Sequence, residues 1–373
     1  MKRTNLPLLD FVNSCYKDTK FDKVLLIASQ HILESQRIMF EYFIEKGLKP
    51  QNIFLIGKCY STNHQVLNRF QKMGIYVSPK SESFDPYSSF DEQFEDYTKE
   101  LLEYVNKKVK LTDYDKVIIL EDGGSILSHA NKILKNASNI VGIEQTSAGY
   151  EKLKNVKLGF PVINVARSNA KLNIESPIIA KTCIERLKKS LTRLNLKPKS
   201  VLIIGAGAVG NAIYERLNGD FLVKRYDLDS KISDYGKESL KSILGSFDVV
   251  IGSTGKEIID TSLYRYLKKD AILVSVSSSD REFSAVNLRK IANKEVNCHE
   301  DIKVNGWYLL NGGFPINFDG AEDSASSKDI QITLALLFAS FCLATKQNYN
   351  NGLIDLDKDI QNLIVSKFNE LKR

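Results

Sequence analysis

The chain has 373 residues, of which 43% are hydrophobic and 26% are charged, a balance typical of a soluble globular protein and unlike that of a disordered one. At about 100–200 residues per domain, this length predicts two or three domains. Basic side chains exceed acidic ones by only 52 to 45. Because the surplus is spread over many segments without interleaved aromatic residues, we expect no nucleic-acid partner.

Apolar runs and cysteine usage bear on the cellular compartment of the protein. No stretch approaches the roughly 20 uninterrupted apolar residues that cross a bilayer, and the apolar run near the N-terminus is interrupted by Asp10. The cysteines are odd in number and lack C-x-x-C spacing, which favours reduced thiols over a disulfide framework or a zinc site. They are Cys15, Cys59, Cys183, Cys298 and Cys342. We therefore expect a cytoplasmic protein with no membrane partner and no metal.

The first half of the chain alternates apolar runs of strand length with segments of helical period. This alternation predicts an α/β protein with a parallel sheet, and the near-continuous Val, Ile and Leu runs predict strands buried on both faces. We expect strands at residues 23–29, 52–58, 75–78, 116–121, 140–144 and 162–165.

A second alternating series follows a long predicted helix at 175–194. Its strands are expected at 200–204, 222–226, 248–252 and 271–276, and two more helices at 327–345 and 355–371. The polar stretch 80–96 is expected to be a surface loop that enters a helix. The chain therefore contains two successive α/β series.

The strongest local motif is the run VLIIGAGAVG, in which Gly205, Gly207 and Gly210 form G-x-G-x-x-G between a predicted strand and a predicted helix. The first glycine permits the tight turn, the second lets the backbone approach a pyrophosphate, and the third lets the helix pack close to the sheet. Ala208 and Val209 begin the helix, whose N-terminus favours anions. The motif predicts a dinucleotide site, although a strand-to-helix turn that binds no nucleotide has the same pattern.

Two further features bear on the cofactor. The next predicted strand ends at Asp227, whose carboxylate can bind the ribose hydroxyls and would repel a 2′-phosphate, so NAD is favoured over NADP. The nearby cations Lys224 and Arg225 would instead favour the 2′-phosphate of NADP. Small residues follow the strand at 248–252, where such sheets contact the cofactor, though they also make ordinary turns; they are Ser253, Thr254 and Gly255.

Other segments resemble one family. The runs ILEDGG (119–124), GIEQTSAG (142–149), PVINVARSNAK (161–171) and LLNGGFPIN (309–317) occur in the same order as in S-adenosylhomocysteine hydrolases, and SQHILES (29–35) is similar to that family's N-terminal active-site segment. From about residue 25 to 345 the chain therefore resembles a divergent member of the S-adenosylhomocysteine hydrolase superfamily.

The resemblance implies a two-domain architecture. A parallel-sheet α/β substrate domain comprises residues 1–170, a Rossmann NAD-binding domain at 171–325 is inserted into it, and C-terminal helices at 326–373 return to the substrate domain. It also implies an enzyme in which tightly held NAD oxidises the 3′-hydroxyl of a nucleoside, so that the neighbouring C–H bond becomes acidic.

The resemblance also assigns roles to residues. Lys171 matches the lysine that assists deprotonation of the 3′-hydroxyl, Asp122 the base for the neighbouring C–H proton, and His31 a histidine that transfers protons. Cofactor-binding positions outside the glycine motif are Thr146, Ser147 and Asn317. Taken alone, His31 could cap or pack a helix, Lys171 could be solvated and Asp122 could be a turn residue.

The chain departs from the family at the implied active site. Gln145 replaces a glutamate, Glu175 an aspartate and Ser278 a histidine, while Arg167 stands at an acidic position. Glu175 is therefore predicted to be catalytic, and Gln145, Arg167 and Ser278 to bind a changed substrate. The resemblance implies a homo-oligomer. Because the C-terminal segment lacks the lysine and tyrosine that grip a neighbouring subunit's cofactor in that family, we expect either its tetramer or a dimer.

These departures favour one function among several. We expect an NAD-dependent enzyme that oxidises a secondary alcohol of a nucleoside or sugar-like small molecule, followed by elimination, epimerisation or net dehydrogenation rather than homocysteine release. The alternatives are a catalytically silent homologue that binds NAD or nucleoside and regulates a partner, an unaltered S-adenosylhomocysteine hydrolase, and a plain amino-acid or hydroxy-acid dehydrogenase.

Overall fold

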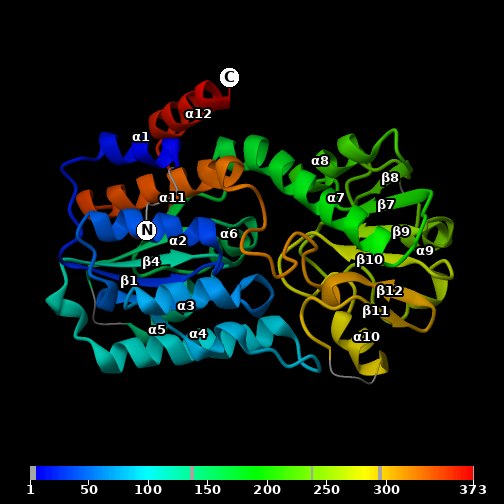
Figure 1. Cartoon of the computed structure of the whole chain (residues 1–373), viewed down its shortest axis with the longest axis horizontal. Helices are drawn as coiled ribbons and strands as arrows, with labels where there is room; N and C mark the ends of the chain where they lie inside the picture. The colour runs from blue at the N-terminus through cyan, green and yellow to red at the C-terminus, as the bar shows by residue number, and fades with distance from the viewer. Residues whose placement is uncertain (1–5, 135–137, 237, 293–295, 373) are drawn as a thin grey trace. The chain divides into compact units, whose positions relative to one another are not determined.

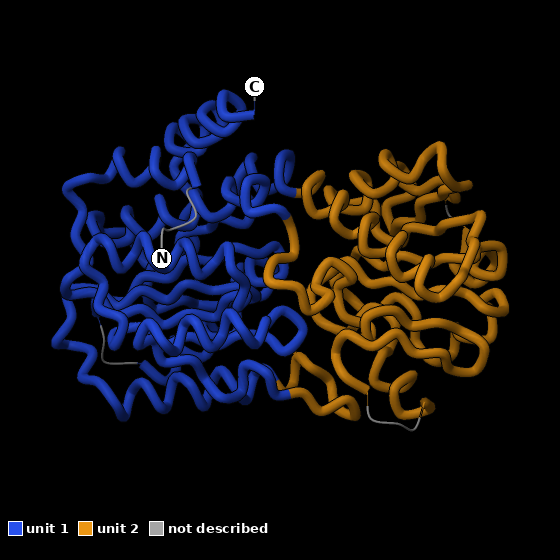
Figure 2. The backbone as a smooth tube through the Cα atoms, in the orientation of Figure 1, with its two compact units in different colours: residues 1–83, 94–175, 326–373 blue, residues 84–93, 176–325 orange. Residues whose placement is uncertain are grey.

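The computed structural model describes residues 6–134, 138–236, 238–292 and 296–372, which divide into two compact units (Figure 2). Unit 1 comprises Met1–Ser83, Phe94–Glu175 and Ser326–Arg373, and unit 2 comprises Phe84–Gln93 and Ser176–Ala325. The predicted fold class is confirmed: a Rossmann-type α/β unit is inserted into a parallel-sheet α/β unit that C-terminal helices complete.

Unit 1 contains a seven-stranded sheet whose strands all run parallel. Its order is β13-β6-β5-β4-β1-β2-β3, so that strands are added on one side of β1 from β2 onward and on the other side from β4 onward. The bounds are β1 Val24–Ser29, β2 Ile53–Ile56, β3 Tyr76–Val77, β4 Lys116–Glu121, β5 Ile140–Glu144, β6 Pro161–Asn164 and β13 Gly352–Asp355. Residues of β1, β2 and β5 are buried throughout, as their apolar runs predict.

Helices cover both faces of this sheet, with α2 and α11 on one side and α4 on the other (Figure 1). The helices are α1 Pro7–Cys15, α2 Glu34–Glu45, α3 His64–Lys72, α4 Phe90–Lys108, α5 Ser125–Ile133, α6 Ser147–Leu153, α11 Ser327–Lys346 and α12 Lys358–Lys372. Among the described residues, α11 is the one helix long and apolar enough to span a membrane, and 83% of its apolar window is buried within the protein. A core helix packed against α1, α2 and the sheet has the same composition.

Unit 2 contains a six-stranded sheet in the order β11-β12-β10-β9-β7-β8. Its strands are β7 Ser200–Ile204, β8 Leu222–Tyr226, β9 Val249–Gly252, β10 Ile272–Ser275, β11 Ile302–Val304 and β12 Trp307–Leu309, and its helices are α7 Ser176–Arg193, α8 Ala208–Leu217, α9 Leu240–Ile243 and α10 Ala285–Ala292. All pairs are parallel except β11 with β12. The order of strand addition reverses between β7 and β9.

The segment Phe84–Gln93 belongs to unit 2, although the sequence predicts a continuous substrate domain over 1–170. The reason is a fully buried arginine on α10. Arg289 donates to the carbonyl of Pro86 at 2.8 Å, pairs with Asp280 at 2.5 Å, and lies over the rings of Phe84 and Phe314. Burial of this charge requires all of these partners, and two of them come from the segment.

Candidate active site

Side chains that follow four neighbouring strands of unit 1 meet at the carboxyl edge of its sheet. Gln30 and His31 follow β1, Lys58 follows β2, Asp122 follows β4 and Gln145 follows β5. Strand addition reverses between β1 and β4, and in such sheets a ligand binds beyond the carboxyl ends at this point. Three of the predicted site residues, His31, Asp122 and Gln145, are thus brought together.

Asp122 is the centre of this group. Its carboxylate pairs with Lys58, accepts a hydrogen bond from the side-chain amide of Gln145, and has Oδ2 3.3 Å from Nε2 of His31. Burial raises the pKa of Asp122, but attraction to Lys58 and His31 outweighs this effect and holds the pKa well below its ordinary value. Asp122 is therefore an anion at neutral pH. Sequence reasoning missed Lys58, because a single lysine after a strand belongs to no motif.

His31 is held at both ring nitrogens. Nε2 faces the anionic Asp122, and Nδ1 lies 2.6 Å from the hydroxyl of Ser61. Facing a carboxylate, Nε2 carries hydrogen in the neutral ring, so Nδ1 accepts from Ser61. The ring is the more exposed partner of the pair, with 15% of its side chain accessible against 4% for Asp122. This arrangement can take up a proton at Nδ1 and stabilise the resulting cation.

Two buried glutamates end the strands β4 and β5, and sequence reasoning missed both. Glu121 and Glu144 are paired in register and are fully buried. Glu121 accepts from the backbone of Ile126 at 2.6 Å, and Glu144 accepts from the backbone and hydroxyl of Thr146, both at 2.7 Å. They fix the turns that follow the two strands. The sequence signal that could have identified them is an acidic residue at the end of an apolar strand.

The approach of the next helix to Glu144 requires a glycine. A Cβ on Gly149 would lie 2.2 Å from Cδ of Glu144, so no other residue fits this position without a shift. Thr146 caps α6 by accepting from the backbone of Gly149 at 3.0 Å, and Ser147 is exposed at the start of that helix. Thr146 therefore has a structural role, and the cofactor role expected for Thr146 and Ser147 remains a prediction.

Burial of Glu121 and Glu144 makes unit 1 sensitive to pH. Burial raises the pKa of both groups. Repulsion from Asp122 adds to the rise at Glu121, where attraction to Lys58 opposes it, and repulsion from Glu121 and Asp122 adds to the rise at Glu144. Above the ordinary glutamate value of 4.5 the unfolded chain releases these protons while the folded chain retains them, so stability falls as pH rises through the raised pKa values.

We expect Glu144→Gln to reduce this loss by about 1.4 kcal/mol for each unit by which the pKa is raised. The measurement is urea unfolding of the wild type and the variant between about pH 5 and pH 8. Asp122 does not change the free energy of unfolding over this pH range, because its lowered pKa places its own pH-dependent effect in more acidic solution. An identical slope with pH in both proteins would show that Glu144 is ionised when folded.

Some polar atoms of the site have no partner in the described part of the chain. Both amide atoms of Gln30 and Oε1 of Gln145 are buried without a hydrogen bond. Buried polar groups are nearly always satisfied, so such atoms call for ordered water or a ligand. The side chains of Gln30 and Gln145 therefore mark this edge of the sheet as a binding site.

Lys171 and Glu175 form a separate pair in a π-helical turn, Lys171–Glu175, before α7. Lys171 Nζ lies 2.5 Å from Oε2 of Glu175, whose Oε1 accepts from the hydroxyl of Thr333 at 2.8 Å. Single π-helical turns are frequent at functional sites. Arg167 is directed elsewhere, since it pairs with Glu151 at 2.5 Å on the surface. The catalytic role of the Lys171–Glu175 pair remains a prediction.

The glycine motif forms the turn between β7 and α8 in unit 2. Gly205 has φ +101°, and a Cβ on Gly210 would lie 1.9 Å from the carbonyl oxygen of Gly205. By contrast, a Cβ on Gly207 would meet nothing within 4 Å. Asp227 accepts from the backbone of Ala206 at 2.8 Å, which places its carboxylate at this turn. Ala208 and Val209 open α8, as predicted. The turn therefore has the close packing and the open face that a dinucleotide needs.

The neighbouring turn after β9 is organised by Glu282, which sequence reasoning missed. This buried carboxylate accepts from the backbones of Thr254 and Gly255, each at 2.7 Å, and from the hydroxyls of Thr254 at 3.0 Å and of Ser277. Burial raises the pKa of Glu282. The turn containing Ser253 lies across the β7–β9 reversal from the glycine motif.

The remaining predicted residues also belong to unit 2. Ser278 is half-buried after β10, and Asn317 is buried after the turn that follows β12. Among the described residues, no group of three or more His, Cys, Asp or Glu side chains could hold a metal ion. None of the five cysteines, all within the described ranges, forms a disulfide.

Sequence comparison identifies close relatives. No family model matches the chain. It is 37% identical over 365 residues to the uncharacterized proteins Rv0104 and MT0113 of Mycobacterium tuberculosis, strains ATCC 25618 / H37Rv and CDC 1551 / Oshkosh, covering 94% of this chain and 71% of each relative. The chain belongs to the family of these proteins.

Solved structures with some likeness are dehydrogenases. They include NAD⁺-bound 3-phosphoglycerate dehydrogenase of Entamoeba histolytica (TM-score 0.42, 12% identity, 88% of this chain and 100% of that one). A 2-hydroxyacid dehydrogenase of Ketogulonicigenium vulgare Y25 has a TM-score of 0.44 and 11% identity over 88% of this chain and 98% of its own. NAD-dependent formate dehydrogenase of Staphylococcus aureus has a TM-score of 0.32 and 13% identity over 68% and 73%.

The expected membership of the S-adenosylhomocysteine hydrolase superfamily was wrong. No family model matches the chain, and the solved structures above are dehydrogenases. The motifs behind that expectation are short and lie at strand ends and turns, such as Gly123 and Gly124 with φ +112° and +76° after β4. Doubly wound sheets share the need for Gly, Asp and Asn at such turns, so these matches report architecture rather than ancestry.

Proposed function

We propose that the protein is an NAD-dependent oxidoreductase that converts a secondary alcohol of a small polar molecule to a ketone. The observation that carries the proposal is the glycine turn after β7, with its tightly packed Gly205 and Gly210 and its open Gly207. Asp227 at this turn favours NAD over NADP, because a carboxylate repels a 2′-phosphate. NAD, when bound, accepts the hydride from the alcohol carbon.

Unit 1 supplies the acid–base chemistry in this proposal. The proton of the substrate hydroxyl would pass to the oxygen of Ser61, whose own proton would move along its hydrogen bond to Nδ1 of His31. Asp122 stabilises the imidazolium through Nε2, and Lys58 keeps Asp122 ionised. His31 would then hold the proton of the alcohol until solvent removes it. Because Gln30 and Gln145 have unpaired amide atoms, they favour a substrate with several hydroxyl, carboxyl or amide groups.

Cofactor binding can be tested at Gly207. Its φ of −71° suits any residue and a Cβ there meets nothing, so Gly207→Val should fold normally while its side chain fills the space left for a dinucleotide. We expect NAD affinity to fall roughly 100-fold, about 2.7 kcal/mol, with a smaller loss in Gly207→Ala. Calorimetric titration with NAD measures the affinity, and thermal unfolding without NAD is the control for folding.

The redox step can be tested by nicotinamide absorbance with NAD and a set of secondary alcohols that includes hydroxy acids and polyols. Reduction in the wild type and its loss in His31→Gln, with NAD binding retained, would support the proposal. Binding of NAD with no reduction by any of these alcohols would instead favour a regulatory homologue. Absence of NAD binding in the wild type would overturn the assignment of the glycine turn.

A further inference from the structure

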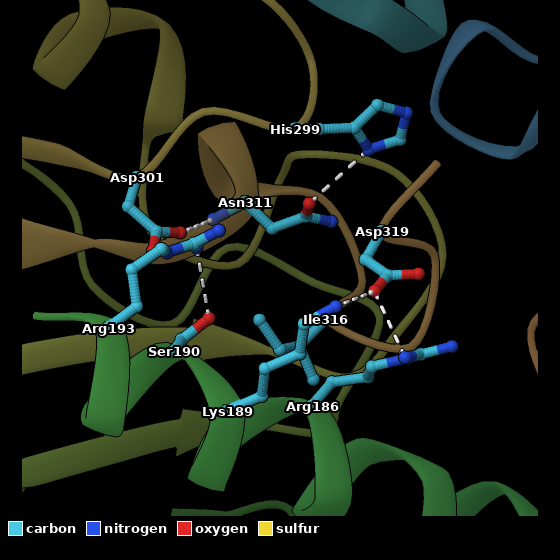
Figure 3. A pocket seen from close by; sticks show the side chains of 9 residues that line it. All are labelled: Arg186, Lys189, Ser190, Arg193, His299, Asp301, Asn311, Ile316 and Asp319. Carbon is cyan, nitrogen blue, oxygen red and sulfur yellow. Dashed lines mark hydrogen bonds and ion pairs between the residues drawn. The ribbon is translucent and has the colours of Figure 1, made fainter. Parts of the chain in front are cut away.

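A second pocket lies in unit 2 and contains none of the residues assigned above to the cofactor or to proton transfer (Figure 3). One wall is α7, which contributes Arg186, Lys189 and Arg193. These positions are three and four residues apart, so their side chains project from the same face of the helix. The facing wall comes from two stretches, 299–301 just before β11 and 311–319 between β12 and α11, and Ile316 adds an apolar contact.

The charges in this pocket do not balance. Three cations on α7 face two carboxylates, which leaves one positive charge. Asp319 is shared between Nη1 of Arg186 at 3.1 Å and Nζ of Lys189 at 3.3 Å, and Asp301 pairs with Arg193. Asp301 also accepts a hydrogen bond from the backbone N–H of Asn311, so its carboxylate is already used within the facing wall. The pocket can therefore take a further anion.

One donor in the pocket lacks an acceptor. Nε of Arg186 is buried and makes no hydrogen bond to the described residues, although Nη1 of the same guanidinium is paired. A guanidinium presents Nε and a terminal nitrogen as a fork that fits two oxygens of a carboxylate or phosphate. A buried Nε without an acceptor, on an arginine that lines a cationic pocket, is consistent with a missing oxyanion.

The facing wall is rigid and offers another donor. Asn311 has φ +52°, and its amide nitrogen donates to the carbonyls of Pro315 and Phe318, both at 2.9 Å. Nδ1 of His299 lies 3.1 Å from the carbonyl of Phe318. Burial lowers the pKa of His299, but its hydrogen bonds, including that with Cys298, outweigh the effect and raise the pKa. His299 therefore adds positive charge more readily than an ordinary histidine.

We propose that this pocket binds a phosphate group, which Arg186 and Lys189 hold from α7 and His299 faces from the other wall. The excess positive charge selects an anion, and the free Nε edge of Arg186 favours a tetrahedral or planar oxyanion over a halide. The ligand is inorganic phosphate or the phosphate of a small metabolite. This site is separate from the dinucleotide turn and does not depend on the proposed redox function.

The test is calorimetric titration of the full-length protein with inorganic phosphate, with potassium chloride at matched ionic strength as the reference. We expect saturable binding at one site, weakened at least about tenfold in Arg186→Gln and Lys189→Gln, which corresponds to about 1.4 kcal/mol. Lys188→Gln is the matched control, because Lys188 stands next to Lys189 but pairs with Asp220 at 2.8 Å, outside the pocket. This control should bind phosphate as the wild type does.

Three outcomes would overturn the proposal. These are no saturable binding in the wild type, an equal loss in Lys188→Gln and Lys189→Gln, and complete displacement of phosphate by NAD. Glycerol phosphate distinguishes the two sources: tighter binding than inorganic phosphate supports a phosphorylated metabolite, and weaker binding supports the free ion. Thermal unfolding of each variant without phosphate shows whether a loss of binding reflects a loss of fold.

Discussion

Replacing Asp122 with asparagine should destabilise the protein by about 3–5 kcal/mol and lower the turnover of any alcohol that reduces NAD by about 100- to 10,000-fold. The first effect arises because Lys58 is buried, so without its anionic partner it must either hold an uncompensated charge or release its proton. The second arises because His31 would lose the carboxylate that stabilises its imidazolium. Urea unfolding and nicotinamide absorbance measure the two effects separately.

A double variant separates stability from chemistry. Lys58→Met combined with Asp122→Asn removes both charges, so most of the lost stability should return, while turnover should stay low. Recovery of turnover along with stability would mean that Asp122 acts only by holding the fold. If Asp122→Asn alone were as stable as the wild type, Lys58 would have to be satisfied by water or by another side chain in that variant.

Replacing Arg289 with methionine should destabilise the protein by about 3–5 kcal/mol. Arg289 is fully buried, and its removal leaves Asp280 as an unpaired buried anion. The carbonyls of Pro86 and Gly312, to which the guanidinium donates at 2.8 Å, would also lose their donor. Denaturant unfolding gives the free energy, and proteolysis within 84–93 should accelerate because Arg289 holds this segment to unit 2.

Arg281 provides the matched control for this prediction. It pairs with Asp91 of the same segment at 2.8 Å, but both side chains are accessible to solvent, at 34% and 43%. Arg281→Met should therefore lower stability by less than about 1 kcal/mol. Combining Arg289→Met with Asp280→Asn should restore part of the stability. An equal loss in the Arg281 and Arg289 variants would show that burial does not set the strength of these pairs.

Local patterns in the sequence predicted the elements that lie inside the two sheets. The apolar runs at 24–29 and 200–204 are buried strands, and the glycine motif forms the expected turn. These predictions succeed because periodicity and glycine spacing act over a few residues. The family resemblance failed because it relied on equally short segments, and short turns recur in unrelated chains of similar architecture.

The sequence by itself determined the α/β class, two successive strand–helix series and a dinucleotide-type turn. Only the tertiary structure decided that His31, Lys58 and Asp122 share one site, because strand order places β1 between β2 and β4 although Lys58 and Asp122 are 64 residues apart. It likewise decided that 84–93 joins unit 2 through Arg289. A local pattern shows that a side chain is buried or charged, but its partner is chosen by packing between segments that are distant along the chain.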